Sequence, residues 1–228
     1  MRVRGARRLI ILRPEPAAGR TADKAARLGF DVLCHPLFAP LPLDWAAPPA
    51  DGFDALLLTS ANTVRLAGAR LAAYRALPTY AVGAATAAAL QEAGFVDVTC
   101  GEGDASAIAA RIGADGHRTV LHLAGTMVAP MEAGPLRLTR IAVYTMTSLP
   151  PDPALLRDAT PGAILLIHSP RAGERLAERI PLDQRSALHI VAISHAALAT
   201  CGSGWASLSA PHQPVDDDML ALALSLCE

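Results

Sequence analysis

Short aliphatic runs recur along the chain, and each is followed by a polar turn and then by an alanine-rich stretch of helical character. Residues 55–58 and 163–167 contain only Ala, Leu and Ile, as expected for strands that are buried on both faces. Helices are predicted over residues 16–28 and near residues 86–93, because a glycine directly follows each stretch. Strands that alternate with helices in this way predict an α/β fold with parallel sheets.

This pattern repeats along the chain. Three pairs of segments match at start-to-start offsets of 108, 110 and 111 residues: 55–67 with 163–177, 80–90 with 190–199, and 9–14 with 120–125. Three matches at nearly one offset are hard to obtain by chance, although each alone is weak. The repeat predicts two similar lobes of flavodoxin-like type, each built on a parallel sheet.

Two extended segments with prolines at their ends, residues 32–38 and 140–147, occupy the same place in the two repeats. If they pair as a two-stranded linker, the chain crosses from one lobe to the other and back. The predicted division is a discontinuous first lobe of residues 1–36 and 149–228, a second lobe of residues 41–142, and linker segments 37–40 and 143–148. The repeat alone also allows a tandem arrangement of two consecutive domains.

Composition narrows the classes of function. The chain has 228 residues, of which 52% are hydrophobic and only 4% aromatic, so we expect a sizeable aliphatic core. The net charge of −1 gives no overall basic surface for nucleic acid. No run reaches the roughly 20 apolar residues of a membrane span, and we expect no secretory signal.

Cysteine and histidine spacing argues against a metal site. The four cysteines form no CxxC pair, and the seven histidines form no HExxH or HxxxH pair. We therefore expect no metal, no dithiol chemistry and a cytoplasmic location. The cysteines are Cys34, Cys100, Cys201 and Cys227.

Candidate binding residues follow the predicted strands, because parallel α/β sheets bind ligands beyond the carboxyl ends of their strands. Small hydroxyl residues and glycines recur there, and they leave backbone N–H groups at helix starts free for anions such as carboxylates. Two arginines add guanidinium groups that can hold a carboxylate by two hydrogen bonds. The candidates are Arg13, Thr59, Ser60, Asn62, Gly83, Thr86, Gly125, Ser169, Arg171 and Ser194.

Helix capping offers a simpler explanation for each of these turns. Ser169 and Pro170 form a near-ideal N-cap and first helical residue, and Ser60 and Asn62 can cap in the same way. Six such turns divided between two lobes favour a shared cleft, which we expect Ser60, Thr86 and Ser169 to line. No nucleophile elbow, GxGxxG or Walker motif is present.

The motifs, taken in order, resemble the uroporphyrinogen-III synthase family. The resemblance runs from about residue 9 to residue 211, and its main segments are Leu12-Arg13-Pro14, Thr59-Ser60-Ala61-Asn62, residues 80–86, residues 92–95, Leu123-Ala124-Gly125, Val143-Tyr144 and residues 168–172. It implies two lobes crossed by linkers, and an enzyme without a cofactor.

The resemblance also implies a reaction. Hydroxymethylbilane loses its terminal hydroxyl as water, and the substituted carbon of ring D attacks the azafulvene that remains. The resulting spiro intermediate breaks and recloses with ring D inverted, giving uroporphyrinogen III. Folding this flexible substrate requires closure about a hinge. The implied partners are hydroxymethylbilane and the upstream enzyme that makes it, and a monomer is the default expectation.

By the same resemblance, Tyr144 is the best candidate to donate a proton to the departing hydroxide. Its position in the predicted linker, facing solvent or the cleft, fits a packing tyrosine equally well. One turn departs from the family: many relatives carry a Gly-Pro-Thr-Thr-like turn where this chain has residues 193–197, so Ser194 is the nearest hydroxyl there.

Two other classes of protein fit the two-lobed pattern. One is a non-catalytic binding protein for an anionic small molecule, which explains the repeat and the cleft equally well. The other is a flavodoxin-like electron carrier, which the low aromatic content disfavours because little could stack on a flavin.

Overall fold

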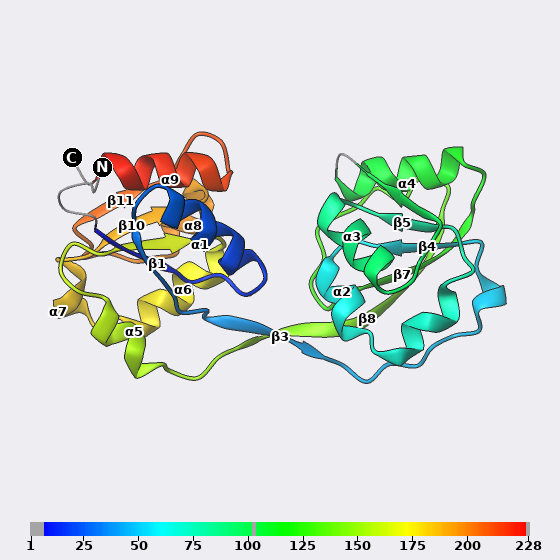
Figure 1. Ribbon diagram of the computed structural model, residues 1–228, viewed down its shortest axis with the longest axis horizontal. Helices are drawn as coiled ribbons and strands as arrows, with labels where there is room; N and C mark the ends of the chain where they lie inside the picture. The colour runs from blue at the N-terminus through cyan, green and yellow to red at the C-terminus, as the bar shows by residue number, and fades with distance from the viewer. Residues whose placement is uncertain (1–6, 102–103, 227–228) are drawn as a thin grey trace. The chain divides into compact units, whose positions relative to one another are not determined.

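The computed structural model describes residues 7–101 and 104–226, so Cys227 lies outside the described residues (Figure 1). The described chain forms two compact units. The first unit combines the residues up to Ala39 with those from Ser148 onward, and the second unit comprises Pro40–Thr147. The first unit is thus made of two separate stretches, because the chain leaves it once and later returns.

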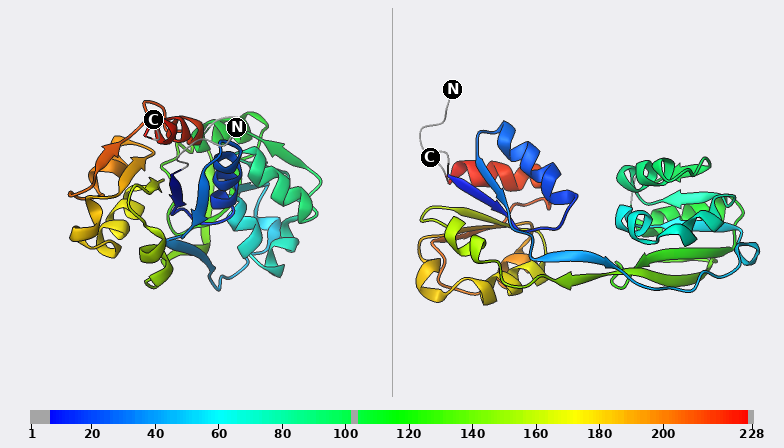
Figure 2. Two further views of the ribbon diagram at one scale, coloured as in Figure 1. Left: turned by 60° about the vertical axis from the view of Figure 1, so that its left-hand side comes forward. Right: turned by 60° about the horizontal axis from the view of Figure 1, so that its bottom comes forward.

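A five-stranded parallel sheet forms the centre of the first unit, in the order β11-β10-β9-β1-β2. Its strands are β1 (Arg8–Ile11), β2 (Asp31–Cys34), β9 (Ile164–Ile167), β10 (His189–Ala192) and β11 (Ser207–Ser209). Its helices are α1 (Ala17–Arg27), α5 (Pro153–Asp158), α6 (Pro170–Arg179), α7 (Leu182–Arg185), α8 (His195–Ala199) and α9 (Asp216–Ser225). Figure 2 shows α1 and α9, in blue and red, together on one face of this sheet.

A six-stranded sheet forms the centre of the second unit, in the order β3-β8-β7-β4-β5-β6. Its strands are β3 (Phe38–Pro42), β4 (Ala55–Leu58), β5 (Thr79–Ala81), β6 (Val98–Cys100), β7 (Thr119–Gly125) and β8 (Arg137–Ser148). Its helices are α2 (Ala61–Leu66), α3 (Ala84–Glu92) and α4 (Ala105–Ala114), with short 3-10 helices η1 (Ala50–Gly52) and η2 (Ala69–Tyr74).

The two sheets share one strand order. Counted along the chain, the first unit has the order 2-1-3-4-5 that is typical of flavodoxin-like folds. The second unit has the same order once β7 is counted as its first strand, with β8, β7, β4, β5 and β6 replacing β2, β1, β9, β10 and β11. The predicted fold class, two similar α/β lobes with parallel sheets, is confirmed.

The central strands are buried as their sequences predict. Every residue of β4 and of β9 has no solvent exposure. In the second unit, Leu56 and Leu58 pack in a cluster with α2 and α3, whereas Ala55 and Leu57 face α4. Side chains of a strand point alternately to its two faces, so helices on both sides explain why no polar residue interrupts β4.

Helix ends also agree with the sequence. The predicted helix 16–28 is α1, and Gly29 follows it with φ of 91°. The helix expected near residues 86–93 is α3, which starts two residues earlier and is followed by Gly94 with φ of 87°. A side chain would strain this left-handed backbone, so glycine favours the helix end there. No helix of the described residues is long and apolar enough to cross a membrane.

The two connecting segments pair with each other. The Leu149 N–H donates to the Leu37 carbonyl, and the Leu43 N–H donates to the Val143 carbonyl, both at 2.9 Å, so β3 and β8 run antiparallel. β3 lies at the edge of its sheet, where its two prolines remove no ladder hydrogen bond from a neighbour. β8 is longer than the expected linker segment 143–148, because it stays paired with β7 as far as Tyr144.

Candidate active site

Most candidate residues follow the carboxyl ends of strands, and several of them lie where the strand order of a sheet reverses. In the first unit the reversal lies between β1 and β9, and Arg13 and Ser169 come two residues after these strands. In the second unit it lies between β7 and β4, where Gly125 ends β7 and Thr59 follows β4. Open α/β sheets bind ligands at this point, so each unit offers one candidate edge.

Three serines cap the helices that follow β4, β9 and β10. Each side-chain oxygen accepts a hydrogen bond from a backbone N–H: Ser60 from Asn62 at 3.2 Å, Ser169 from Ala172 at 3.2 Å, and Ser194 from Ala197 at 3.3 Å. Capping is therefore confirmed at Ser60 and Ser169, whereas Asn62 lies within α2 and supplies the N–H that the Ser60 cap accepts. Each serine accepts from only one backbone N–H. The other N–H groups of the first helical turn have no intrahelical acceptor, so they remain available to an anion.

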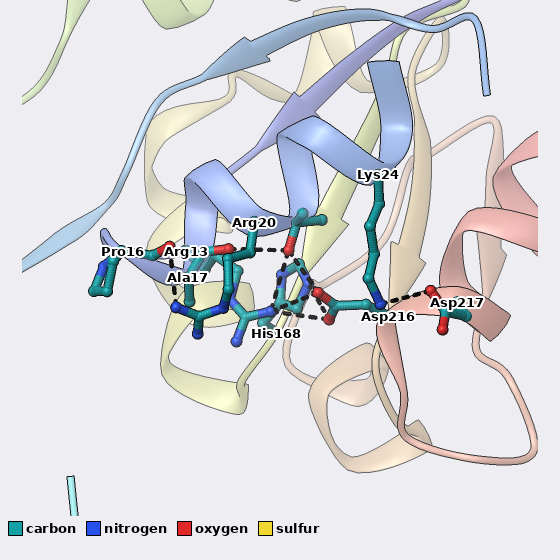
Figure 3. Close-up of polar contacts among 9 residues, drawn as sticks. Arg13, Pro16, Ala17, Arg20, Lys24, His168, Asp216 and Asp217 are labelled. Atoms are coloured by element: carbon teal, nitrogen blue, oxygen red, sulfur yellow. Dashed lines mark hydrogen bonds and ion pairs between the residues drawn. The ribbon is translucent and has the colours of Figure 1, made fainter. Parts of the chain in front are cut away.

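Arg13 is held by side chains from two helices (Figure 3). Its Nη1 donates to both carboxylate oxygens of Asp216, at 2.9 and 3.1 Å, and to Thr21 Oγ1 at 3.3 Å. The Thr21 hydroxyl in turn lies 2.6 Å from Asp216 Oδ2. The Nε and Nη2 atoms of Arg13 bond no residue that the structure describes, so part of the guanidinium fork remains for a ligand.

His168 completes this network from the end of β9. Its Nε2 lies 3.3 Å from Asp216 Oδ1. Contact with His168, the Thr21 hydroxyl and the Arg13 charge together hold the pKa of Asp216 well below its usual range. Burial lowers the pKa of His168 despite the nearby carboxylate, so the pair consists of a neutral imidazole and a charged Asp216 at neutral pH.

Arg171 lies in the first turn of α6 and is exposed. Its guanidinium carbon stands 4.9 Å from the ring centroid of Phe38, a cation–π contact that restrains the side chain. The side chain of Arg171 makes no hydrogen bond or ion pair with another described residue. Its donors are therefore free for the bidentate carboxylate contact that the sequence suggested.

The carboxyl edge of the second unit's sheet carries fewer charged candidate residues than that of the first unit. Gly83 is the N-cap of α3, and a Cβ there would meet nothing within 4 Å, so the backbone of this turn is open to approach. Thr86, in contrast, is only 5% exposed, because α3 turns this position toward the core. We expected Thr86 to line a shared cleft, but its side chain is buried and the backbone of the turn is the accessible part. Thr59 Oγ1 lies 3.4 Å from His122 Nε2.

Tyr144 belongs to the sheet of the second unit and not to a free linker. It pairs with Gly125 just after an irregularity in the register between Ala124 and Gly125. A Cβ on Gly125 would lie 2.7 Å from Tyr144 Cζ, so only glycine leaves room for the ring. Tyr144 is 9% exposed and packs in the core, yet its hydroxyl bonds no described residue. Such bulges often orient side chains near active sites.

The family model described as uroporphyrinogen-III synthase HemD matches residues 19–221. The chain belongs to the uroporphyrinogen-III synthase family. Members of this family are cyclising lyases of porphyrin and heme biosynthesis that act on hydroxymethylbilane, and this chain is such an enzyme. Family membership therefore decides against the two rival classes, the non-catalytic binding protein and the electron carrier.

A solved structure of a uroporphyrinogen-III synthase has a similar fold. The Helicobacter pylori protein is 17% identical, with 96% of this chain and 99% of that chain covered and a TM-score of 0.64. The Thermus thermophilus protein, in its wild-type form, is 20% identical, with 97% and 98% covered and a TM-score of 0.43. No curated protein matches the sequence significantly.

Sequence reasoning missed Asp216 and Thr21, which orient Arg13. Asp216 opens the last helix in a run of three aspartates, and acidic residues are ordinary in a first helical turn. It lies 203 residues from Arg13 in sequence, so no local motif joins the two. Among the described residues, no group of three or more His, Cys, Asp or Glu side chains could hold a metal ion.

Proposed function

We propose that the two sheet edges bind hydroxymethylbilane through its carboxylates, and that Tyr144 assists loss of the hydroxyl. One observation carries the binding part of this proposal: Arg13 and Arg171 lie at the carboxyl edge of one sheet with unpaired guanidinium nitrogens. The helix starts at Ser60, Ser169 and Ser194 add backbone donors. Together they hold several of the eight carboxylates of the substrate without a large net charge on the protein.

The chemical step requires proton transfer as well as binding. In this proposal, the Tyr144 hydroxyl donates its proton to the hydroxide as the carbon–oxygen bond breaks, so that water leaves. The adjacent pyrrole N–H becomes acidic in the same step, and its proton restores the phenol while the azafulvene forms. The unpaired Tyr144 hydroxyl, fixed by ring packing on Gly125, supports this role.

Orientation of ring D distinguishes the enzyme from spontaneous closure. Without enzyme, the bilane closes to the un-inverted ring, so ring closure itself is easy and positioning is the difficult part. Anchored carboxylates favour attack through the substituted carbon of ring D, which gives the spiro intermediate. When that intermediate breaks and recloses, ring D is inverted.

We also propose a cytoplasmic monomer that receives the bilane from the upstream enzyme. The described cysteines, Cys34, Cys100 and Cys201, are all unpaired, which fits a reducing compartment. Sedimentation velocity of the purified chain tests the oligomeric state. A concentration-dependent dimer would contradict the proposed monomer.

Product analysis tests the proposed function directly. The purified chain is mixed with freshly made hydroxymethylbilane, and the isomers are separated after oxidation to porphyrins. We expect isomer III with the enzyme and isomer I in its absence. Arg13→Gln and Arg171→Gln should raise the KM for the bilane several-fold each, because each removes a charged carboxylate contact. Formation of isomer I alone, or unchanged KM in both variants, would overturn the proposal.

A further inference from the structure

A cavity in the second unit carries polar groups that the proposed active site does not use. Its volume is about 400 Å³, and residues 128–131 and Leu138 form its apolar walls. Among the described residues that line it, only His122 and Arg140 have charged or titratable side chains. The cavity lies on the face of the sheet that α4 covers, because Met131 and Leu138 pack with the cluster formed by α4.

The internal repeat explains why the cavity exists. In the first unit α1 connects β1 to β2, and its Ala18 and Ala25 pack in one cluster with Ile11. In the second unit residues 126–136 connect β7 to β8, and this stretch, described throughout, forms no helix. His122 stands at the position of Ile11 in the repeat. A buried polar side chain thus replaces an apolar one at the place where the covering helix is missing.

The His122 ring has an unsatisfied nitrogen. The residue is 2% exposed, and its Nδ1 has no hydrogen-bond partner among the described residues. If the Thr59 hydroxyl donates to Nε2, 3.4 Å away, the neutral ring carries its proton on Nδ1. A buried N–H without an acceptor is unfavourable, so this position favours a ligand that accepts a hydrogen bond.

Arg140 supplies a positive charge beside this donor. It is paired with His122 in the register of β7 and β8, so both side chains lie on one face of the sheet. Arg140 is exposed, and its side chain makes no ion pair or hydrogen bond with another described residue. A cation, a neutral donor and apolar walls suit an anion that is joined to a short hydrocarbon stem.

We propose that this cavity binds a carboxylate on a short apolar stem. Arg140 contacts the carboxylate, His122 Nδ1 donates a hydrogen bond to it, and residues 128–131 with Leu138 cover the stem. A propionate arm of a tetrapyrrole has this chemistry, and so does a separate small carboxylate metabolite. The inference does not depend on the proposed function, because it concerns binding within the second unit alone.

Histidine NMR of the full chain, titrated with propionate, tests this proposal. The His122 ring resonances are assigned by their loss in His122→Gln. We expect them to shift saturably, with a dissociation constant in the millimolar range because the ligand is small. Arg140→Met should weaken propionate binding at least tenfold. Arg137→Met is the matched control, because it removes a charge from the same strand on its other face.

Steady-state kinetics then distinguish the two sources of the carboxylate. If a substrate arm occupies the cavity, Arg140→Met raises the KM for hydroxymethylbilane and propionate competes with it. If a separate metabolite binds, KM stays unchanged while the propionate titration still depends on Arg140. Either result supports a carboxylate site. No saturable shift at about 100 mM propionate, well above the millimolar range expected for so small a ligand, would overturn it. Equal affinity for propionate in Arg140→Met and Arg137→Met would also overturn the proposed carboxylate site, whether or not the chain forms isomer III.

Discussion

Tyr144 combines two properties that rarely occur together in one residue, a ring packed in the core and a hydroxyl without a partner among the described residues. Its ring packs in the core against the backbone of Gly125, while its hydroxyl remains without a partner in the described structure. Burial alone explains a phenylalanine at this place as well as a tyrosine. The unpaired hydroxyl on β8, beside the end of β7 at Gly125, is therefore the feature that needs a functional explanation.

Tyr144→Phe should slow turnover about tenfold or more and leave KM nearly unchanged. The hydroxyl acts as charge develops on the leaving oxygen, so its removal affects the transition state more than substrate binding. Tyr80→Phe is the control, because it also removes a phenol from this unit but one that bonds Asp115. The assay follows total ring closure and the isomer ratio. Wild-type rate and product would make Tyr144 a packing residue.

His122 should make stability depend on pH. Burial, and to a lesser extent the Arg140 charge, lower its pKa from 6.5 to about 4 in the folded chain. Between these pH values the unfolded chain binds a proton that the folded chain does not. The folded state is thus fully favoured above pH 6.5 and loses at most about 3 kcal/mol as the pH falls to 4.

His122→Ile should reduce this pH dependence, because isoleucine does not titrate and is the residue at the equivalent position of β1. Urea denaturation at several pH values measures the free energy of unfolding of both chains. His212→Gln, a change at an exposed histidine, is the control. Parallel profiles for His122→Ile and the unchanged chain would contradict a buried, neutral His122.

At the scale of elements, α9 packs the C-terminal stretch against α1 and β1 at the start of the chain. Met219, Leu220 and Ala223 pack with α1 residues against β1 and β9. Asp216, at the first position of α9, adds the polar network with Arg13. One helix therefore both completes the core of the first unit and orients a candidate substrate-binding residue.

Asp216→Asn should lower the free energy of unfolding by about 1–3 kcal/mol at neutral pH, since it removes a charged partner from Arg13 and Thr21. The Asp216 pKa is depressed, so its contribution is present above the ordinary carboxyl range and is lost as the pH falls. Asp217→Asn is the control. Its 2.7 Å pair with Lys24 is exposed and should be worth less than about 1 kcal/mol. Equal losses in both variants would argue against the network.

The sequence predicted the strands, their repeat and the helix stops, because those features depend on local periodicity and on glycine at positive φ. It predicted the caps at Ser60 and Ser169 because a serine directly before a helix start is also a local signal. It did not predict the burial of Thr86 or the partner of Arg13. Those depend on which helix face meets the core and on contacts across 203 residues, which no local pattern encodes.

At the scale of the whole molecule, the second unit resembles an insertion into the first. The chain leaves the first unit near Ala39 and re-enters it at Ser148, and β3 and β8 are paired at that point. Each unit has its own sheet and its own buried core. The two ends of the inserted segment are therefore adjacent. Domains joined in this way can often be produced as separate chains.

We predict that the two units fold when they are made separately. Residues 40–147 form one chain, and the first unit is closed by an Asn-Gly turn that joins residue 39 to residue 148, since paired antiparallel strands need only two connecting residues. We expect cooperative urea unfolding and dispersed amide NMR spectra for both. Neither alone should yield isomer III, because the proposed substrate contacts are divided between them. If residues 40–147 stayed unfolded while the full chain folded, the units would be interdependent, and the core of the second unit would require the first for its stability.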